Sequence, residues 1–229
     1  MIATKKNKKK DKKAKEAPKS VKDEKSIVIV NNIQSPSPPE SELRTLTLYG
    51  DINEQKGADV TSALLYLENN SHIEMEIPGE KEDETAVSVV ARPITMIVST
   101  HGGTASDMFS ILDVMDMIKQ RTCDIETLGI GKVMSAGVPI LAAGTKGRRK
   151  VGRNCRIMLH NVMAGTGGTI FSMENELEEI KWIQERYIEC LANYTKLTPS
   201  KIKKLLKTQK DVYISSEEAI KMGIADEII

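Results

Sequence analysis

Three side chains in this sequence have the chemistry that a hydrolytic nucleophile needs, although they lie far apart along the chain. Ser135 carries its hydroxyl within Val-Met-Ser-Ala-Gly, between a β-rich run and a helix of small residues. His160, one of only three histidines, ends the apolar run Cys-Arg-Ile-Met-Leu-His, and Asp211 precedes Val-Tyr-Ile. A hydroxyl becomes nucleophilic when a base takes its proton, and a carboxylate can orient that base. The three residues therefore have the types that a catalytic triad requires.

Each of these residues also has an ordinary structural explanation. Ser135 could be the N-cap of the helix that follows, because a serine side chain readily accepts from a free amide there. His160 could be a buried, hydrogen-bonded histidine, and Asp211 a surface or turn carboxylate. Their occurrence together, in this order, is what favours catalysis.

Two glycines, Gly102 and Gly103, follow an apolar run and precede a helical pattern. Glycine is needed where the backbone must take a positive φ or approach a substrate, so amides of this turn could point into a site; a simple tight turn is the alternative. No phosphate-binding glycine pattern or P-loop lysine follows. No cluster of His, Asp or Glu has metal-ligand spacing. We expect neither a cofactor nor a metal.

The elements that must position these residues alternate between strands and helices. A first strand is predicted over 45–50 and an amphipathic helix from Val60 to about Asn70. A continuous apolar strand over 94–100, a helix through Met108 to Ile118, a strand over 125–131 and a small-residue helix over 135–143 follow. Serial βα units predict an α/β fold with its chemistry at the carboxyl ends of the strands.

Two further segments stand outside this alternation. Residues 71–92 combine two β-rich runs around an acidic turn, which predicts an inserted, solvent-facing hairpin. From Met173 to Tyr194, apolar residues recur every three or four positions, so a long helix there must find a partner surface along its length. Without one, Leu177, Ile180 and Ile183 would be exposed.

Composition indicates one folded domain and a separate N-terminal segment. The 229 residues are 40% hydrophobic, enough for one substantial core, and only 3% aromatic, which argues against a single-strand nucleic-acid binder. Residues 1–25 hold eleven lysines against four acidic residues, a net charge of +7. We predict a disordered Lys-rich tail and linker over 1–43 and one domain over 44–229. An electrostatic role of the tail toward nucleic acid, membrane or an acidic partner stays open.

The cellular compartment is predicted from short apolar runs and cysteine usage. The apolar run Ile27 to Val30 is far shorter than a signal-peptide core or a membrane span. Three widely spaced cysteines, Cys123, Cys155 and Cys190, match no metal pattern and indicate reduced thiols. We expect a cytoplasmic protein.

Taken together, the motifs resemble the proteolytic subunit of Clp protease over about residues 44–229. The most specific are Met-Ser-Ala-Gly with Ala-Ala-Gly-Thr-Lys-Gly-Arg-Arg downstream, and Arg-Ile-Met-Leu-His. The Gly-Gly turn lies ahead of them, and Ile-Ser-Ser-Glu-Glu-Ala with Met-Gly-Ile-Ala-Asp follows Asp211. The fold this implies is the ClpP/crotonase-like α/β superhelical stack of β-α-β units, with a protruding handle helix over 172–197.

The resemblance implies a serine endopeptidase. Ser135 would be the nucleophile, His160 the base and Asp211 the carboxylate that orients it. The amides of Gly103 and Ala136 would form the oxyanion hole. The family's chemistry requires no cofactor.

The resemblance also implies an assembly. Family members are homo-oligomers of two stacked heptameric rings, a tetradecamer whose handle helices pack the rings together into a self-compartmentalised barrel. An AAA+ unfoldase such as a Clp ATPase delivers unfolded polypeptide substrates to it. Neither a membrane nor nucleic acid is an expected partner.

The sequence departs from the family in features that concern partner recognition more than chemistry. Thr100-His101 stands where the family usually has Ser-Pro before the two glycines, and Ala136 replaces the usual methionine. The 71–92 segment looks inserted, and the tail is longer and more basic than a typical mature N-terminus.

Three other functions are considered. A crotonase-type enzyme acting on acyl-CoA shares the superfold and a glycine-based oxyanion hole, but lacks a serine, histidine and aspartate set. A non-catalytic ring subunit or scaffold would have lost triad residues, which are retained here. A viral capsid-maturation peptidase of the same clan would keep the chemistry and change the substrate.

Overall fold

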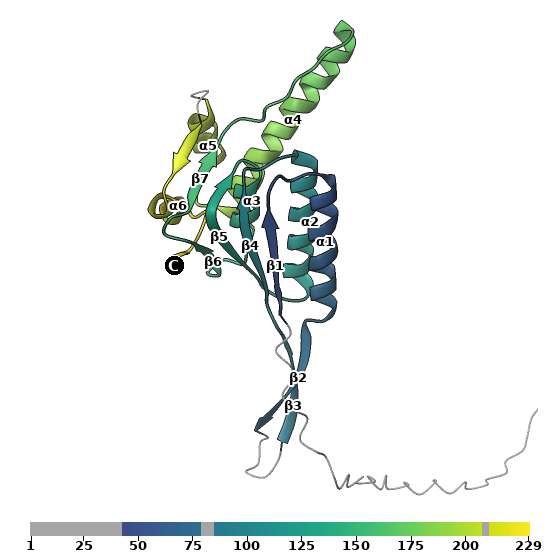
Figure 1. The fold of residues 1–229 in the computed structure, drawn as a ribbon, viewed down its shortest axis with the longest axis vertical. Coiled ribbons are helices and arrows are strands. Elements are labelled where there is room, and N and C mark those ends of the chain that lie inside the picture. Colours follow the sequence, from purple (N-terminus) through teal and green to yellow (C-terminus); the bar gives the residue numbers. More distant parts are fainter. Residues whose placement is uncertain (1–42, 79–84, 208–210) are drawn as a thin grey trace, which may run out of the picture. The chain divides into compact units, whose positions relative to one another are not determined.

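The described part of the chain is built around a mostly parallel β-sheet. The computed structural model describes residues 43–78, 85–207 and 211–229, so the predicted tail over 1–43 lies outside the described residues except for Leu43. Among the described residues, five parallel strands lie side by side in this sheet in the order β1 (Thr45–Tyr49), β4 (Ile94–Thr100), β5 (Ile125–Met134), β6 (Arg149–Val151) and β9 (Glu227–Ile228). The α/β prediction is confirmed (Figure 1).

Strand β4 shows why the sheet forms where the sequence predicts it. Its residues Ile94, Met96 and Val98 are fully buried, and the strand lies between β1 and β5. A strand covered on both faces is expected to be largely apolar, and four of the first five residues of β4 are apolar, with Thr95 as the exception.

Strand β5 divides between two partners. Its first half pairs with β6, and its second half, Lys132–Met134, pairs with β7 (Arg156–Leu159). The predicted strand ended at Gly131; the observed one continues to Met134 because β7 supplies a second ladder. Strand β7 pairs in turn, antiparallel, with β8 (Val212–Ile214).

Helices cover the sheet. The shorter ones are α1 (Glu54–Asn69), α2 (Ala105–Arg121), α3 (Gly137–Ala142), α5 (Pro199–Leu206) and α6 (Ser216–Met222). Helices α1 and α2 pack side by side, α1 against β1 and β4 and α2 against β5 (Figure 1). Helix α1 begins before its first apolar residue because the Asn53 side chain caps it by accepting from the Lys56 amide.

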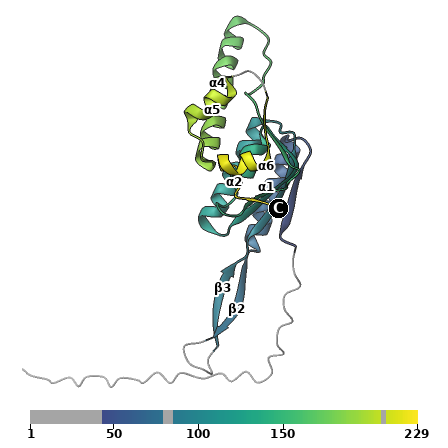
Figure 2. The same cartoon turned by 90° about the vertical axis from the view of Figure 1, so that its left-hand side faces the viewer.

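Strands β2 (His72–Pro78) and β3 (Thr85–Ala91) form a separate two-stranded antiparallel sheet. They occupy the segment for which a hairpin is predicted, and residues 79–84 between them lie outside the described residues. In Figures 1 and 2 the pair lies beyond the ends of β1 and β4.

The longest helix, α4 (Ile170–Tyr194), has two different halves. It begins at Ile170 because the Thr169 side chain caps it by accepting from the Ser172 amide. It ends at Tyr194, three residues before the predicted 197, because the backbone of Thr195 is extended. Its inner end buries Tyr187, Ile188 and Leu191, whereas its outer half is exposed and projects from the sheet (Figure 2).

Candidate active site

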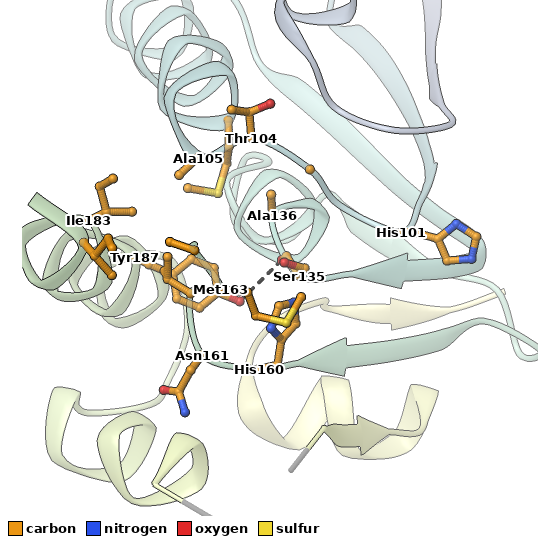
Figure 3. A pocket seen from close by; sticks show the side chains of 15 residues that line it. His101, Thr104, Ala105, Ser135, Ala136, His160, Asn161, Met163, Ile183 and Tyr187 are labelled. Carbon is orange, nitrogen blue, oxygen red and sulfur yellow. Dashed lines mark hydrogen bonds between the residues drawn. The ribbon is translucent and has the colours of Figure 1, made fainter. Parts of the chain in front are cut away.

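The pairing between the end of β5 and β7 brings two of the predicted residues, Ser135 and His160, to one cavity. Ser135 directly follows β5 and His160 directly follows β7, and these strands are parallel neighbours. The Ser135 amide donates to the Met158 carbonyl at 2.8 Å, so the chain segments stay paired to that point. Both residues line one cavity of about 370 Å³, and Figure 3 shows the His160 ring beside the Ser135 side chain.

Ser135 has an unusual backbone. Its φ is +52°, a positive value that no other described residue except glycine has. This conformation costs roughly 1–2 kcal/mol for a residue with a Cβ, and such strain is concentrated at functional sites. The N-cap explanation of Ser135 is wrong, because Ala136 is the N-cap of α3 and no side chain caps that helix.

The backbone of Gly103 faces the same cavity. Ile52 bridges Gly103 in parallel: its amide donates to the Gly102 carbonyl at 2.8 Å, and its carbonyl accepts from Thr104 at 2.9 Å. In a parallel bridge these bonds go to the neighbours of Gly103, so its own amide points to the other side, away from Ile52. Gly103, Ser135 and Ala136 all line the cavity.

Gly102 explains why a side chain is excluded from this turn. A Cβ on Gly102 would lie 2.6 Å from the Ser135 Cβ and 3.0 Å from the Ala136 nitrogen. Gly102 therefore lies in direct contact with the strained serine turn, in addition to forming a turn between strand and helix.

Asp211 is placed differently. It is exposed and does not line the cavity, and among the described residues no hydrogen bond joins His160 to Ser135 or to Asp211. Asp211 nevertheless lies next to the strand that pairs with β7. Leu159 pairs with Val212 in the antiparallel ladder, His160 directly follows Leu159, and Asp211 directly precedes Val212.

A comparison with protein families agrees with this arrangement. The family model described as Clp protease matches residues 86–229, which is more than half of the chain. The matched range contains every residue that the sequence analysis assigns to the site. The chain belongs to the Clp protease family. Clp proteases are serine peptidases, and the mixed α/β architecture with its mostly parallel sheet is consistent with the fold of this family.

The remaining walls of the cavity in this Clp protease were not assigned from sequence. They come from α2, from the segment after His160 and from α4, and the apolar members are Met108, Val162, Met163, Ile180, Ile183 and Tyr187. Ile180 and Ile183 are partly buried in this wall, so this part of the apolar stripe has the partner surface that its spacing predicts, whereas Leu177 is 49% exposed. The one signal in the sequence is the tyrosine within the apolar stripe, because a buried tyrosine hydroxyl needs a polar partner, but the sequence does not indicate which partner that is.

No cysteine lines this cavity. The described residues include all three thiols, Cys123, Cys155 and Cys190, and none lines it. Burial raises the pKa of Cys155 and Cys190 to about 11, which keeps both thiols protonated near neutral pH.

Within residues 43–78, 85–207 and 211–229, no helix is both long and apolar enough to cross a membrane. In that same part of the chain, His, Cys, Asp and Glu side chains form no group of three with the proximity that a metal ion requires.

Proposed function

We propose that this Clp protease is a serine endopeptidase with Ser135 as nucleophile, His160 as general base and Asp211 as the orienting carboxylate. The observation that carries the proposal is the strained Ser135, which shares its cavity with His160 at the ends of two paired strands. A nucleophile on a sharp strand-to-helix turn is exposed to substrate and lies near the free amides of the helix start.

Asp211 completes the set through the β7–β8 register. The observed ladder ends at Leu159 and Val212, and one further pair would bring His160 opposite Asp211; the Cβ atoms of cross-strand pairs lie about 4.5–5.5 Å apart. A carboxylate at this distance can accept from one imidazole nitrogen while the other faces Ser135. We propose that this pairing forms in the active enzyme.

The reaction follows from these roles. Ser135 Oγ attacks the peptide carbonyl as His160 takes its proton, and the C–N bond breaks as His160 returns that proton to the leaving amine. Water then attacks the acyl-enzyme as His160 takes its proton, and the bond between the acyl carbon and Ser135 Oγ breaks as His160 returns that proton to Oγ, which releases the carboxylic acid. The oxyanion formed in both steps accepts from the amides of Gly103 and Ala136. Among the described residues neither amide has a hydrogen-bond partner of its own.

Gly103→Ala should lower kcat by about 10²–10³-fold, the usual cost of losing one oxyanion donor. A Cβ on Gly103 would lie 2.0 Å from the Ile52 carbonyl oxygen, so the backbone must move and carry its amide with it. The matched control is Gly147→Ala, another positive-φ glycine, whose Cβ would meet nothing within 4 Å. Steady-state peptide hydrolysis checks this; equal activity of the two variants would contradict the oxyanion role.

The apolar wall predicts the substrate class. A fluorogenic peptide with Leu or Met before the cleaved bond should have a kcat/KM at least ~100-fold above one with Asp or Glu there. Apart from His101 and His160, no basic side chain is among the described residues that line the cavity, so the charge of an acidic side chain would be desolvated. The experiment compares such a peptide pair on the purified protein. A preference for the acidic peptide, or hydrolysis of neither, would contradict the proposal.

The outer half of α4 supports the assembly that the family suggests. Ile170 and Phe171 are 67% and 78% exposed, and Met173 and Leu177 continue the apolar surface. Exposed apolar patches of this kind mark interaction sites. We propose that this surface packs two heptameric rings into a tetradecamer that receives unfolded polypeptides from an AAA+ unfoldase. Native mass spectrometry tests it: a stable monomer would contradict the ring assembly.

A further inference from the structure

The inner end of α4 contacts both segments that carry the proposed serine and histidine. The Tyr187 hydroxyl donates to the Ser135 carbonyl at 3.4 Å, the contact drawn in Figure 3. One turn earlier, the Gln184 side-chain oxygen accepts from the Val162 amide at 2.7 Å. Residues three apart lie on the same helix face, so one face of α4 holds both segments.

The contact of Tyr187 acts on the strained residue. Ser135 keeps its positive φ only if the surrounding structure holds both of its peptide groups. Its amide donates to Met158, and its carbonyl accepts from the Val138 amide and from Tyr187. Tyr187 is 4% exposed, and burial raises the pKa of its hydroxyl, which therefore remains a donor.

The contact of Gln184 acts on the segment after His160. Residues 160–168 form no helix or strand, so backbone ladders do not fix them. Two side-chain amides take that role: Asn161 donates to the Leu206 carbonyl at 2.7 Å, and Gln184 accepts from Val162. Val162 is two residues from His160, so the anchor at Gln184 limits how far the imidazole can move from Ser135.

We infer that Tyr187 and Gln184 are positioning residues that hold Ser135 and His160 at reacting distance from one helix. The inference rests on the proposed function. Neither side chain transfers a proton; Tyr187 acts through the Ser135 backbone and Gln184 through the Val162 backbone. The Tyr187 ring also forms part of the cavity wall, a separate role that a phenylalanine would keep.

Tyr187→Phe should lower kcat by on the order of 10-fold and leave KM within about twofold, since the apolar wall is kept while the alignment loosens. Gln184→Leu should lower kcat by a similar factor. Gln184→Glu keeps an acceptor for the Val162 amide, so its kcat should stay close to that of the parent protein. The matched control is Tyr194→Phe on the same helix. It removes a hydroxyl that donates to Asp116 at 2.5 Å, outside the cavity, and should leave kcat unchanged.

Peptide kinetics and thermal unfolding of the four variants and the parent protein decide between the outcomes. Unchanged kcat in Tyr187→Phe and Gln184→Leu, with an active parent, would overturn the inference alone. Equal losses in Gln184→Leu and Gln184→Glu would overturn the role of the Val162 contact. A parent without turnover that depends on Ser135 would instead overturn the proposed function. If Tyr187→Phe does not fold, the comparison of Gln184→Leu with Gln184→Glu still tests the inference, because Gln184 is only partly buried.

Discussion

Ser135→Ala should lower kcat for peptide hydrolysis by at least ~10⁴-fold while the protein keeps its fold. The substitution removes only Oγ, and alanine meets the same cost at a φ of +52° as serine does. The oxyanion amides and the apolar wall are unchanged, so peptide binding should persist. Fluorogenic peptide kinetics measure the loss, and circular dichroism confirms the fold.

The matched control for this serine is Ser106→Ala. Ser106 is an exposed serine in the first turn of α2, close to the cavity residues Thr104 and Ala105 but not among those that line the cavity. Its substitution should leave kcat within about twofold. Comparable activity in Ser135→Ala and Ser106→Ala would show that another group supplies the nucleophile.

Asp226→Asn should destabilise the protein by about 2–4 kcal/mol at pH 7. Asp226 accepts from Arg149, whose side chain is only 4% exposed, with N–O distances of 2.6 and 2.8 Å. The same guanidinium donates to the carbonyls of Ala142 and Tyr194, which joins the ends of α3 and α4 to the C-terminal segment. Without the carboxylate, a buried cation would lose its counter-charge.

This stabilisation should depend on pH. The hydrogen bonds from Arg149 hold the pKa of Asp226 below its ordinary value of 3.8. A depressed native pKa means that the contribution is complete above the unfolded pKa and is lost as pH falls through the native pKa. Urea unfolding should therefore show the full difference between parent and Asp226→Asn at pH 7 and a smaller one below about pH 3.5.

The control for this ion pair is Glu227→Gln, whose exposed pair with Lys150 spans 3.9 Å. Exposed pairs contribute little, so we expect a change within about 0.5 kcal/mol. A difference between parent and Asp226→Asn that stays constant from pH 7 to pH 3 would refute the account of the Arg149 pair.

Several elements of the fold could be predicted because their signals are local. The apolar run of β4 and the glycine turn depend on neighbouring residues, and the structure has both. The extra length of β5 could not be predicted, because it depends on pairing with β7, more than 20 residues further along the chain.

The site could be predicted only in part. Ser135, His160 and Gly103 belong to recognisable motifs, and the structure places them around one cavity. Tyr187 and Gln184 could not be assigned, because their contacts depend on how the inner end of α4 packs. Asp211 stays a prediction, supported by strand register rather than by an observed bond.

Covalent labelling tests the central claim most directly. The purified protein is treated with a fluorophosphonate probe, which reacts with activated serines, and the adduct is mapped by peptide mass spectrometry. We predict a single adduct on Ser135, lost in Ser135→Ala and strongly slowed in His160→Ala. An adduct on any other residue, or undiminished labelling of Ser135→Ala, would contradict the assignment of Ser135 as the nucleophile.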